Sequence, residues 1–164
     1  MMISSTYRLT WLRVLEFWIA PILIIAILSF LIYADFEKDS HVDFGKLIGY
    51  LFLILIFLGP FVWLFFNHFN NLGILKLEFT ESDIIFYQND SIIKIAYKDI
   101  INVTEYSSNR YGNGKLLWSD IAKWHIQTKS LEIVVSSLVI SKTNLKMFIT
   151  ADWLFEPTFF PTMQ

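Results

Sequence analysis

Two long stretches without a charged side chain constrain this chain more than any other feature of its sequence. Residues 17–34 and residues 47–66 contain no Asp, Glu, Lys or Arg and consist mostly of apolar side chains. A helix needs roughly 20 such residues to cross the hydrocarbon core of a bilayer, which is about 30 Å thick. We therefore predict that both stretches are transmembrane helices of an integral membrane protein.

The two predicted spans form a tight helical hairpin, because only residues 35–46 connect them. Both chain ends then lie on one side of the membrane. Arg8 and Arg13 precede the first span, whereas the connecting loop holds Lys38 and Lys46 beside four acidic residues. Acidic residues count little in the positive-inside rule, so the N-terminal flank is favoured on the cytoplasmic side. The sequence thus predicts a protein of the cytoplasmic (inner) membrane with both termini in the cytoplasm.

The composition of the spans and of the whole chain excludes several classes of function. Ion sites and proton relays need ionisable groups inside the membrane, and the spans have none, so we expect an anchor and not a transporter. The absence of cysteine excludes disulfide scaffolds and Cys-ligated metal sites. A net charge of −2 gives no electrostatic reason to expect nucleic-acid binding. His41, His68 and His125 lie in separate segments, so we expect no metal site, no cofactor and no catalytic residue.

After residue 74 the hydrophobic pattern changes to the period of two that is typical of half-buried strands. Leu75, Leu77 and Phe79, for example, alternate with polar residues. Each connection has the length of a hairpin, which indicates antiparallel pairing, and such a sheet curls into a small barrel or two packed sheets. The six or seven expected strands cover residues 75–79, 84–88, 93–97, 100–106, 124–128, 131–135 and 138–140.

A C-terminal helix is expected after these strands, over residues 142–153. Ser141 is suited to cap it, and Leu145, Phe148 and Ile149 give it one apolar face. The tail that follows is unusually aromatic for a free end. We expect the tail to fold back onto the domain or to enter the membrane interface, with a partner-recognition peptide as the alternative.

The β-rich region resembles a known family. Its "Leu-Glu-Phe-Thr", "Ile-Ala-Tyr-Lys-Asp-Ile" and closing "Glu-Ile-Val-Val-Ser-Ser-Leu-Val-Ile-Ser" segments, together with the two preceding spans, resemble bacterial pleckstrin-homology-like (PH-like) membrane proteins. The resemblance implies a roll of six to seven antiparallel strands capped by a C-terminal helix. It also implies binding or scaffolding and no enzymatic activity. The tip of the first hairpin, residues 80–83, is acidic, which does not support inositol-lipid recognition there.

One cluster of residues suits a binding surface, because it places aromatic side chains beside cations. Such a surface fits a protein hot spot or an anionic lipid headgroup. The candidate partner- or headgroup-binding residues are Tyr106, Arg110, Tyr111, Lys115 and Trp118.

The sequence therefore predicts a membrane-anchored, non-enzymatic PH-like module that recruits or assembles a protein partner at the cytoplasmic membrane. The alternative is a lipid- or ligand-sensing regulatory module, and a homo-oligomer stays open. The predicted parts are an N-terminal interfacial segment (1–16), the first span (17–34), a short acidic extracytoplasmic loop (35–46), the second span (47–66), a hinge (67–73), the PH-like domain (74–153) and an aromatic tail (154–164).

Overall fold

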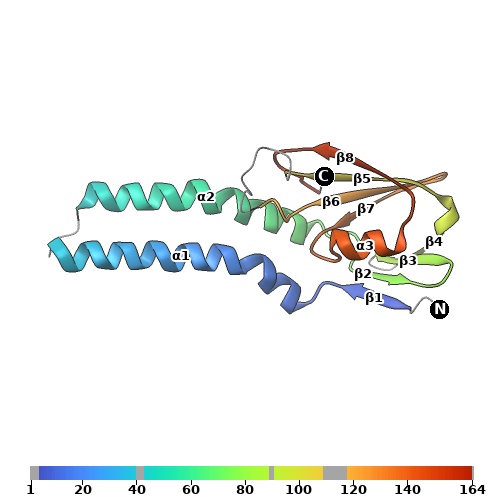
Figure 1. Ribbon diagram of the computed structural model, residues 1–164, viewed down its shortest axis with the longest axis horizontal. Helices are drawn as coiled ribbons and strands as arrows, with labels where there is room; N and C mark the ends of the chain where they lie inside the picture. The colour runs from blue at the N-terminus through green and yellow to red at the C-terminus, as the bar shows by residue number, and fades with distance from the viewer. Residues whose placement is uncertain (1–3, 40–42, 89–90, 109–117, 164) are drawn as a thin grey trace.

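The computed structural model describes residues 4–39, 43–88, 91–108 and 118–163. Two long helices project as a hairpin from one end of a β-rich body that carries both chain ends (Figure 1). The elements are β1 (Ser5–Arg8), α1 (Trp11–Asp39), α2 (Phe44–Asn70), β2 (Lys76–Phe79), β3 (Asp83–Gln88), β4 (Ser91–Ala96), a 3-10 turn (Tyr97–Asp99), β5 (Ile100–Ser107), β6 (Lys123–Thr128), β7 (Glu132–Ser136), α3 (Lys142–Phe148) and β8 (Asp152–Pro157).

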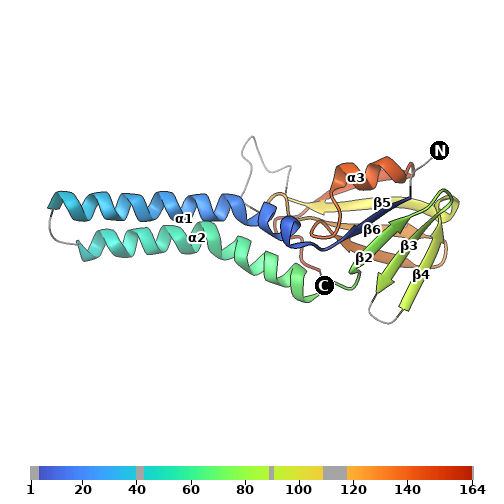
Figure 2. The ribbon, with the colours of Figure 1, turned by 90° about the horizontal axis from the view of Figure 1, so that it is seen from below.

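Helices α1 and α2 are long and apolar enough to cross a membrane. The core helix of a soluble protein would be largely buried, but only 11% and 17% of the two most apolar windows are buried. Phe30 and Leu55 are each about two-thirds exposed. Figure 2 shows the hairpin extending away from both sheets. The uncovered part of the hairpin therefore presents an apolar surface to its surroundings.

The first sheet has the strand order β1-β2-β3-β4 and is antiparallel throughout the described pairs. Strand β1 lies within residues 1–16, where we expected an interfacial segment and no strand. It pairs directly with β2, so that Ser5 lies opposite Phe79. Tyr7 explains this placement, because its ring makes an edge-on contact with Phe79 at a centroid distance of 5.6 Å. The helical hairpin is thus the connection between two neighbouring strands.

The second sheet has the order β7-β6-β5-β8, and β8 runs parallel to β5. The expectation of purely antiparallel strands is therefore wrong for β8. The predicted helix over residues 142–153 is also too long, because α3 ends at Phe148 and the chain becomes extended at Ile149. Residues 138–140, expected as a strand, form a buried turn in which the amide of Val139 donates to Ser136 O (3.1 Å). The tail folds back onto the domain, as one of the two alternatives predicted.

Two hydrophobic clusters organise the body. The first lies between the two sheets and beneath α3, where Phe79 and Phe148 stack at 4.2 Å. The second joins the helices to the domain, and its buried members include Phe17, Phe61 and Trp118. Residues 67–70 of the predicted hinge belong to α2, which continues to Asn70 and packs on the domain through buried side chains such as Leu64 and His68. The arrangement of two apolar helices and a β-rich region in two sheets agrees with a PH-like fold.

Candidate functional site

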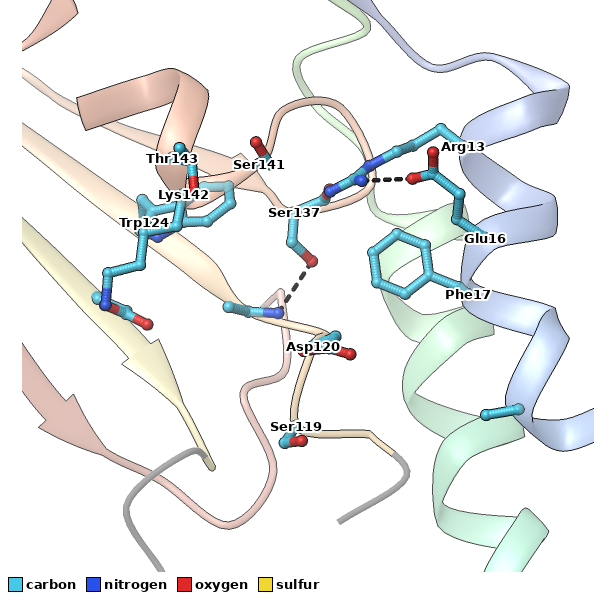
Figure 3. A pocket seen from close by; sticks show the side chains of 13 residues that line it. Arg13, Glu16, Phe17, Ser119, Asp120, Trp124, Ser137, Ser141, Lys142 and Thr143 are labelled. Atoms are coloured by element: carbon cyan, nitrogen blue, oxygen red, sulfur yellow. Dashed lines mark hydrogen bonds and ion pairs between the residues drawn. The ribbon is translucent and has the colours of Figure 1, made fainter. Parts of the chain in front are cut away.

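A cleft of about 390 Å³ opens between the first turns of α1 and the β-rich body. Figure 3 shows Phe17 on α1 and, across from it, Ser137 and Asp120. Elements far apart in the sequence meet here, because the second hydrophobic cluster holds α1 against the domain. The polar and charged side chains that line the cleft are Arg13, Glu16, Glu105, Ser119, Asp120, Ser137, Ser141, Lys142 and Thr143.

Arg13 connects α1 to the domain at one side of the cleft. Its Nη1 donates to Glu16 Oε2 at 2.5 Å, and its Nη2 donates to the carbonyl oxygen of Ser137 at 3.2 Å. The guanidinium group also lies over the ring of Phe17, at 5.1 Å from the centroid. These contacts fix the rotation of the first turns of α1 relative to the turn between β7 and α3.

Glu105 forms the opposite side of the cleft. It lies on β5 in the inward-facing register, opposite Trp124 of β6, and its side chain is almost fully buried. Its Oε2 pairs with the Nζ of Lys142, the first residue of α3, and its Oε1 accepts from the hydroxyl of Ser107 at 3.1 Å. A buried carboxylate is tolerated only with such partners. The ion pair therefore holds the start of α3 at the edge of the cleft.

Three polar groups of the cleft have no such partner. Within the described residues, the buried Arg13 Nε and Trp124 Nε1 make no hydrogen bond, and Asp120 has no ion-pair partner. Buried donors are normally satisfied, so each exception needs an explanation. The two donors are enclosed in the protein, whereas the carboxylate of Asp120 is exposed at the cleft.

Tyr106, the first of the predicted binding residues, lies on the outer face of the second sheet. Its ring is 4.7 Å from the ring of His125, and the Nζ of Lys123 lies 5.3 Å from its centroid. Partial burial, together with a hydrogen bond to Glu156, raises the pKa of Tyr106, and burial lowers the pKa of Lys123. His125 also pairs with Glu132 on β7. We call the surface formed by these four side chains the Tyr106 face. Its members are Tyr106, Lys123, His125 and Glu132.

Trp118 lies elsewhere, within the second hydrophobic cluster. It is 6% exposed, its Nε1 donates to the carbonyl oxygen of Phe159 at 3.1 Å, and its ring stacks near Phe160. Trp118 thus contacts the C-terminal tail. The other three predicted residues, Arg110, Tyr111 and Lys115, lie outside the described residues.

The sequence reasoning missed the cleft, although Glu105 was a usable signal, since a charge at an inward strand position is unusual.

In the part of the chain that the structure describes, no group of three His, Asp or Glu side chains could hold a metal ion.

Comparison with known proteins defines the class of the fold. A family model described as PH domain matches residues 6–148, so the chain belongs to the PH domain family. The match begins inside β1 and ends at α3, and it therefore includes both apolar helices, whereas β8 and the tail follow it. No curated protein and no solved structure matches the chain. PH domains are generally non-catalytic binding modules.

Proposed function

We propose that this PH-domain protein is anchored in the cytoplasmic membrane by α1 and α2 and binds a protein partner there without catalysing a reaction. Membership of the PH domain family supports the binding role. The low burial of the apolar helices supports the anchor. The observation that carries the partner-binding role is the Tyr106 face, which offers an aromatic ring beside a cation on a rigid sheet.

The Tyr106 face has the chemistry of a protein hot spot. Tyr is enriched at such sites because it buries a large apolar area and keeps a hydrogen-bonding group. Strand β5 is paired with β6 on one side and β8 on the other, so Tyr106 is held in a fixed place. Leu154 of β8, which is about half exposed, lies on the same face. We propose that Arg110, Tyr111 and Lys115, which follow β5 closely in the chain, extend this surface, while Trp118 positions the tail.

A capture experiment with a matched control tests the partner. Full-length protein, solubilised from membranes in mild detergent, is isolated as wild type, Tyr106→Ala and Tyr87→Ala. Tyr87 is the control because it also has a lysine over its ring, with Lys76 Nζ at 4.3 Å, and also binds a glutamate, Glu78 (2.9 Å). We expect a stoichiometric protein with wild type and Tyr87→Ala that is lost with Tyr106→Ala. Recovery of no stoichiometric protein, or equal loss with both variants, would overturn the proposal.

The side of the membrane is tested separately. Arg8 and Arg13 near the domain, against Lys38 at the end of α1 and Lys46 at the start of α2, support a cytoplasmic domain. A reporter that is active only in the cytoplasm, fused to the C-terminus, should be active. A silent reporter on a stably expressed fusion would place the domain on the other side.

A second candidate function is lipid or ligand sensing, and the cleft beside α1 is the specific observation that favours it. Its polar lining lies next to Phe17, where the apolar stretch of α1 begins.

A further inference from the structure

We infer that the segment after β8 is a membrane contact, in which the aromatic side chains of Phe159 and Phe160 enter the interface between acyl chains and headgroups. The inference rests on the anchoring role of α1 and α2 proposed above and not on partner binding at the Tyr106 face. It gives the domain a third attachment to the bilayer, one that is not helical.

Contacts with α2 fix the position of this segment. Strand β8 points toward the helical hairpin (Figure 1). Beyond β8, the ring of Phe160 packs edge-on against Trp63 of α2, with 5.6 Å between the ring centroids. The amide of Met163 then donates to Asn67 Oδ1 at 2.8 Å, which is about one helical turn closer to the end of α2. Phe159 and Phe160 therefore form the tip of a loop that reaches along α2 toward its apolar part.

The depth of this tip follows from the length of α2. Lys46 precedes a long stretch of α2 without charged residues, and Trp63 follows Leu47 by about 24 Å at 1.5 Å per residue. A hydrocarbon core of about 30 Å that begins at Leu47 would end about one helical turn beyond Trp63, close to Phe66. Helix α1 gives the same level, because its charge-free stretch begins at Phe17, which packs in one cluster with this part of α2. The tip thus lies at the boundary of the hydrocarbon core.

The side chains at this level form a continuous apolar surface, which we call the tip patch. It consists of Phe159, Phe160, Trp63 and Phe66, each of which is 38–52% exposed. The rings of Phe159 and Phe160 lie 4.6 Å apart, and residues 157–163 hold no Asp, Glu, Lys or Arg. On α2 the patch continues to the exposed Ile56, two turns further along the face of Trp63. Aromatic side chains are enriched at membrane interfaces, so a charge-free patch that continues a lipid-facing helix fits the bilayer.

The backbone of the tip has hydrogen-bond partners within the protein, as this position requires. A non-helical segment at the membrane is tolerated only where its polar backbone groups are satisfied without lipid. Three successive carbonyl oxygens accept hydrogen bonds, that of Phe159 from Trp118 Nε1 (3.1 Å), that of Phe160 from the amide of Thr162 (2.9 Å) and that of Pro161 from His68 Nε2 (2.5 Å). Proline at position 161 also has no N–H group to satisfy.

The absence of cysteine from the chain allows a spin label to be placed at single positions. Full-length Phe159→Cys, Ile101→Cys and Leu55→Cys are labelled with a nitroxide and reconstituted into vesicles of phosphatidylcholine and phosphatidylglycerol. Ile101 is the matched control, because it is 50% exposed but lies about 20 Å along β5 from Ser107, whose carbonyl oxygen accepts from the amide of Thr158. Leu55, an exposed residue within α2, reports whether the helix lies in lipid.

Depth is measured by collisions of the label with oxygen, which concentrates in lipid, and with a water-soluble nickel complex. We expect the ratio of oxygen to nickel collisions to be highest at position 55, intermediate at position 159 and lowest at position 101. In a second arm, Phe159→Trp and Ile101→Trp each add one tryptophan to the six of the chain. Lipids brominated close to the headgroup should quench a larger fraction of the fluorescence in Phe159→Trp. This variant keeps an aromatic ring at the tip, so the second arm holds even where the labelled cysteine disturbs the segment.

The outcomes separate this inference from the anchor on which it rests. Equal ratios at positions 159 and 101, with position 55 in lipid, would overturn the membrane contact and leave the anchor intact, as would equal quenching of the two tryptophan variants. A label at position 159 that neither collider reaches would mean that a protein partner or a second copy covers the tip patch, which also overturns the inference. An aqueous ratio at position 55 would overturn the anchor and the inference together. Failure to capture a protein partner would leave these results unaffected.

Discussion

Replacing His68 by phenylalanine should destabilise the junction between α2, β7 and the tail. His68 is fully buried, with its Nδ1 2.8 Å from Ser136 Oγ and its Nε2 2.5 Å from the carbonyl oxygen of Pro161. Ser136 Oγ already accepts from the amide of Leu138 at 3.2 Å, so its hydrogen is available to Nδ1. The ring is therefore neutral, and its Nε2–H donates to Pro161. One side chain thus joins three segments.

The magnitude follows from the two hydrogen bonds. Each contributes about 1 kcal/mol net, and a buried carbonyl left without a donor costs about 1–3 kcal/mol. Phenylalanine keeps the size of the ring, so little cavity cost is added. His68→Phe should therefore lower the free energy of unfolding by about 2–4 kcal/mol. His68→Gln can still donate near the position of Nε2 and should lose less.

The assay is unfolding of the full chain in detergent, followed by tryptophan fluorescence, with limited proteolysis of the tail as a second readout. His125→Phe is the control, because His125 is part of the outer face of the second sheet and contacts Tyr106 and Glu132. We expect the tail to be cleaved faster in His68→Phe only. Equal stability of wild type, His68→Phe and His68→Gln would refute the assigned hydrogen bonds, as would equal losses in His68→Phe and His125→Phe.

Two further substitutions are checked by the same unfolding assay. Lys142→Met leaves the buried carboxylate of Glu105 without its cation and should lower the free energy of unfolding by about 3 kcal/mol. Adding Glu105→Gln to this variant removes the unpaired charge and should recover part of the loss. Strictly additive losses in the double variant would contradict the coupling. Tyr7→Ala removes a partly buried ring from contacts with Phe79 and Phe148 and should lower the free energy of unfolding by about 2 kcal/mol. If residues 5–8 were an unattached interfacial segment, the substitution would leave the free energy of unfolding unchanged.

The strongly periodic parts of the fold were predictable from the sequence. The two apolar helices follow from length and hydropathy, and strands β2 to β7 follow from alternation. The cap of α3 was also predictable, since Ser141 Oγ accepts from the amide of Asn144 at 3.2 Å. In each case the signal lies within a few residues of the element that it forms.

The errors concern elements whose stability comes from distant partners. Strand β1 has only four residues, and its partner β2 follows both helices, so no local pattern marks it. The helix was predicted to run to residue 153 because Phe148 and Ile149 continue the apolar face of α3, and residues 154–157 were predicted as tail. Pairing with β5 instead makes residues 152–157 a strand. The cleft was missed for the same reason, because its lining is divided among α1, β5, β6, the start of α3 and the turns between them, and each of these contributes only one to four residues.

The position of the helical hairpin within the sheet has a mechanical consequence for any binding role. A domain attached by one flexible linker can tumble above a membrane, but this domain is attached at both ends of the hairpin, through β1 before α1 and β2 after α2. The contact of Arg13 with Ser137 and the packing of Phe61 and Trp118 add connections at two further places. A tilt of α1 must therefore move the whole domain or break one of these contacts. If the hairpin spans the bilayer as proposed, these attachments hold the Tyr106 face and the cleft at a fixed depth and orientation relative to the membrane. A ligand that fills the cleft between α1 and the domain would then stabilise that orientation.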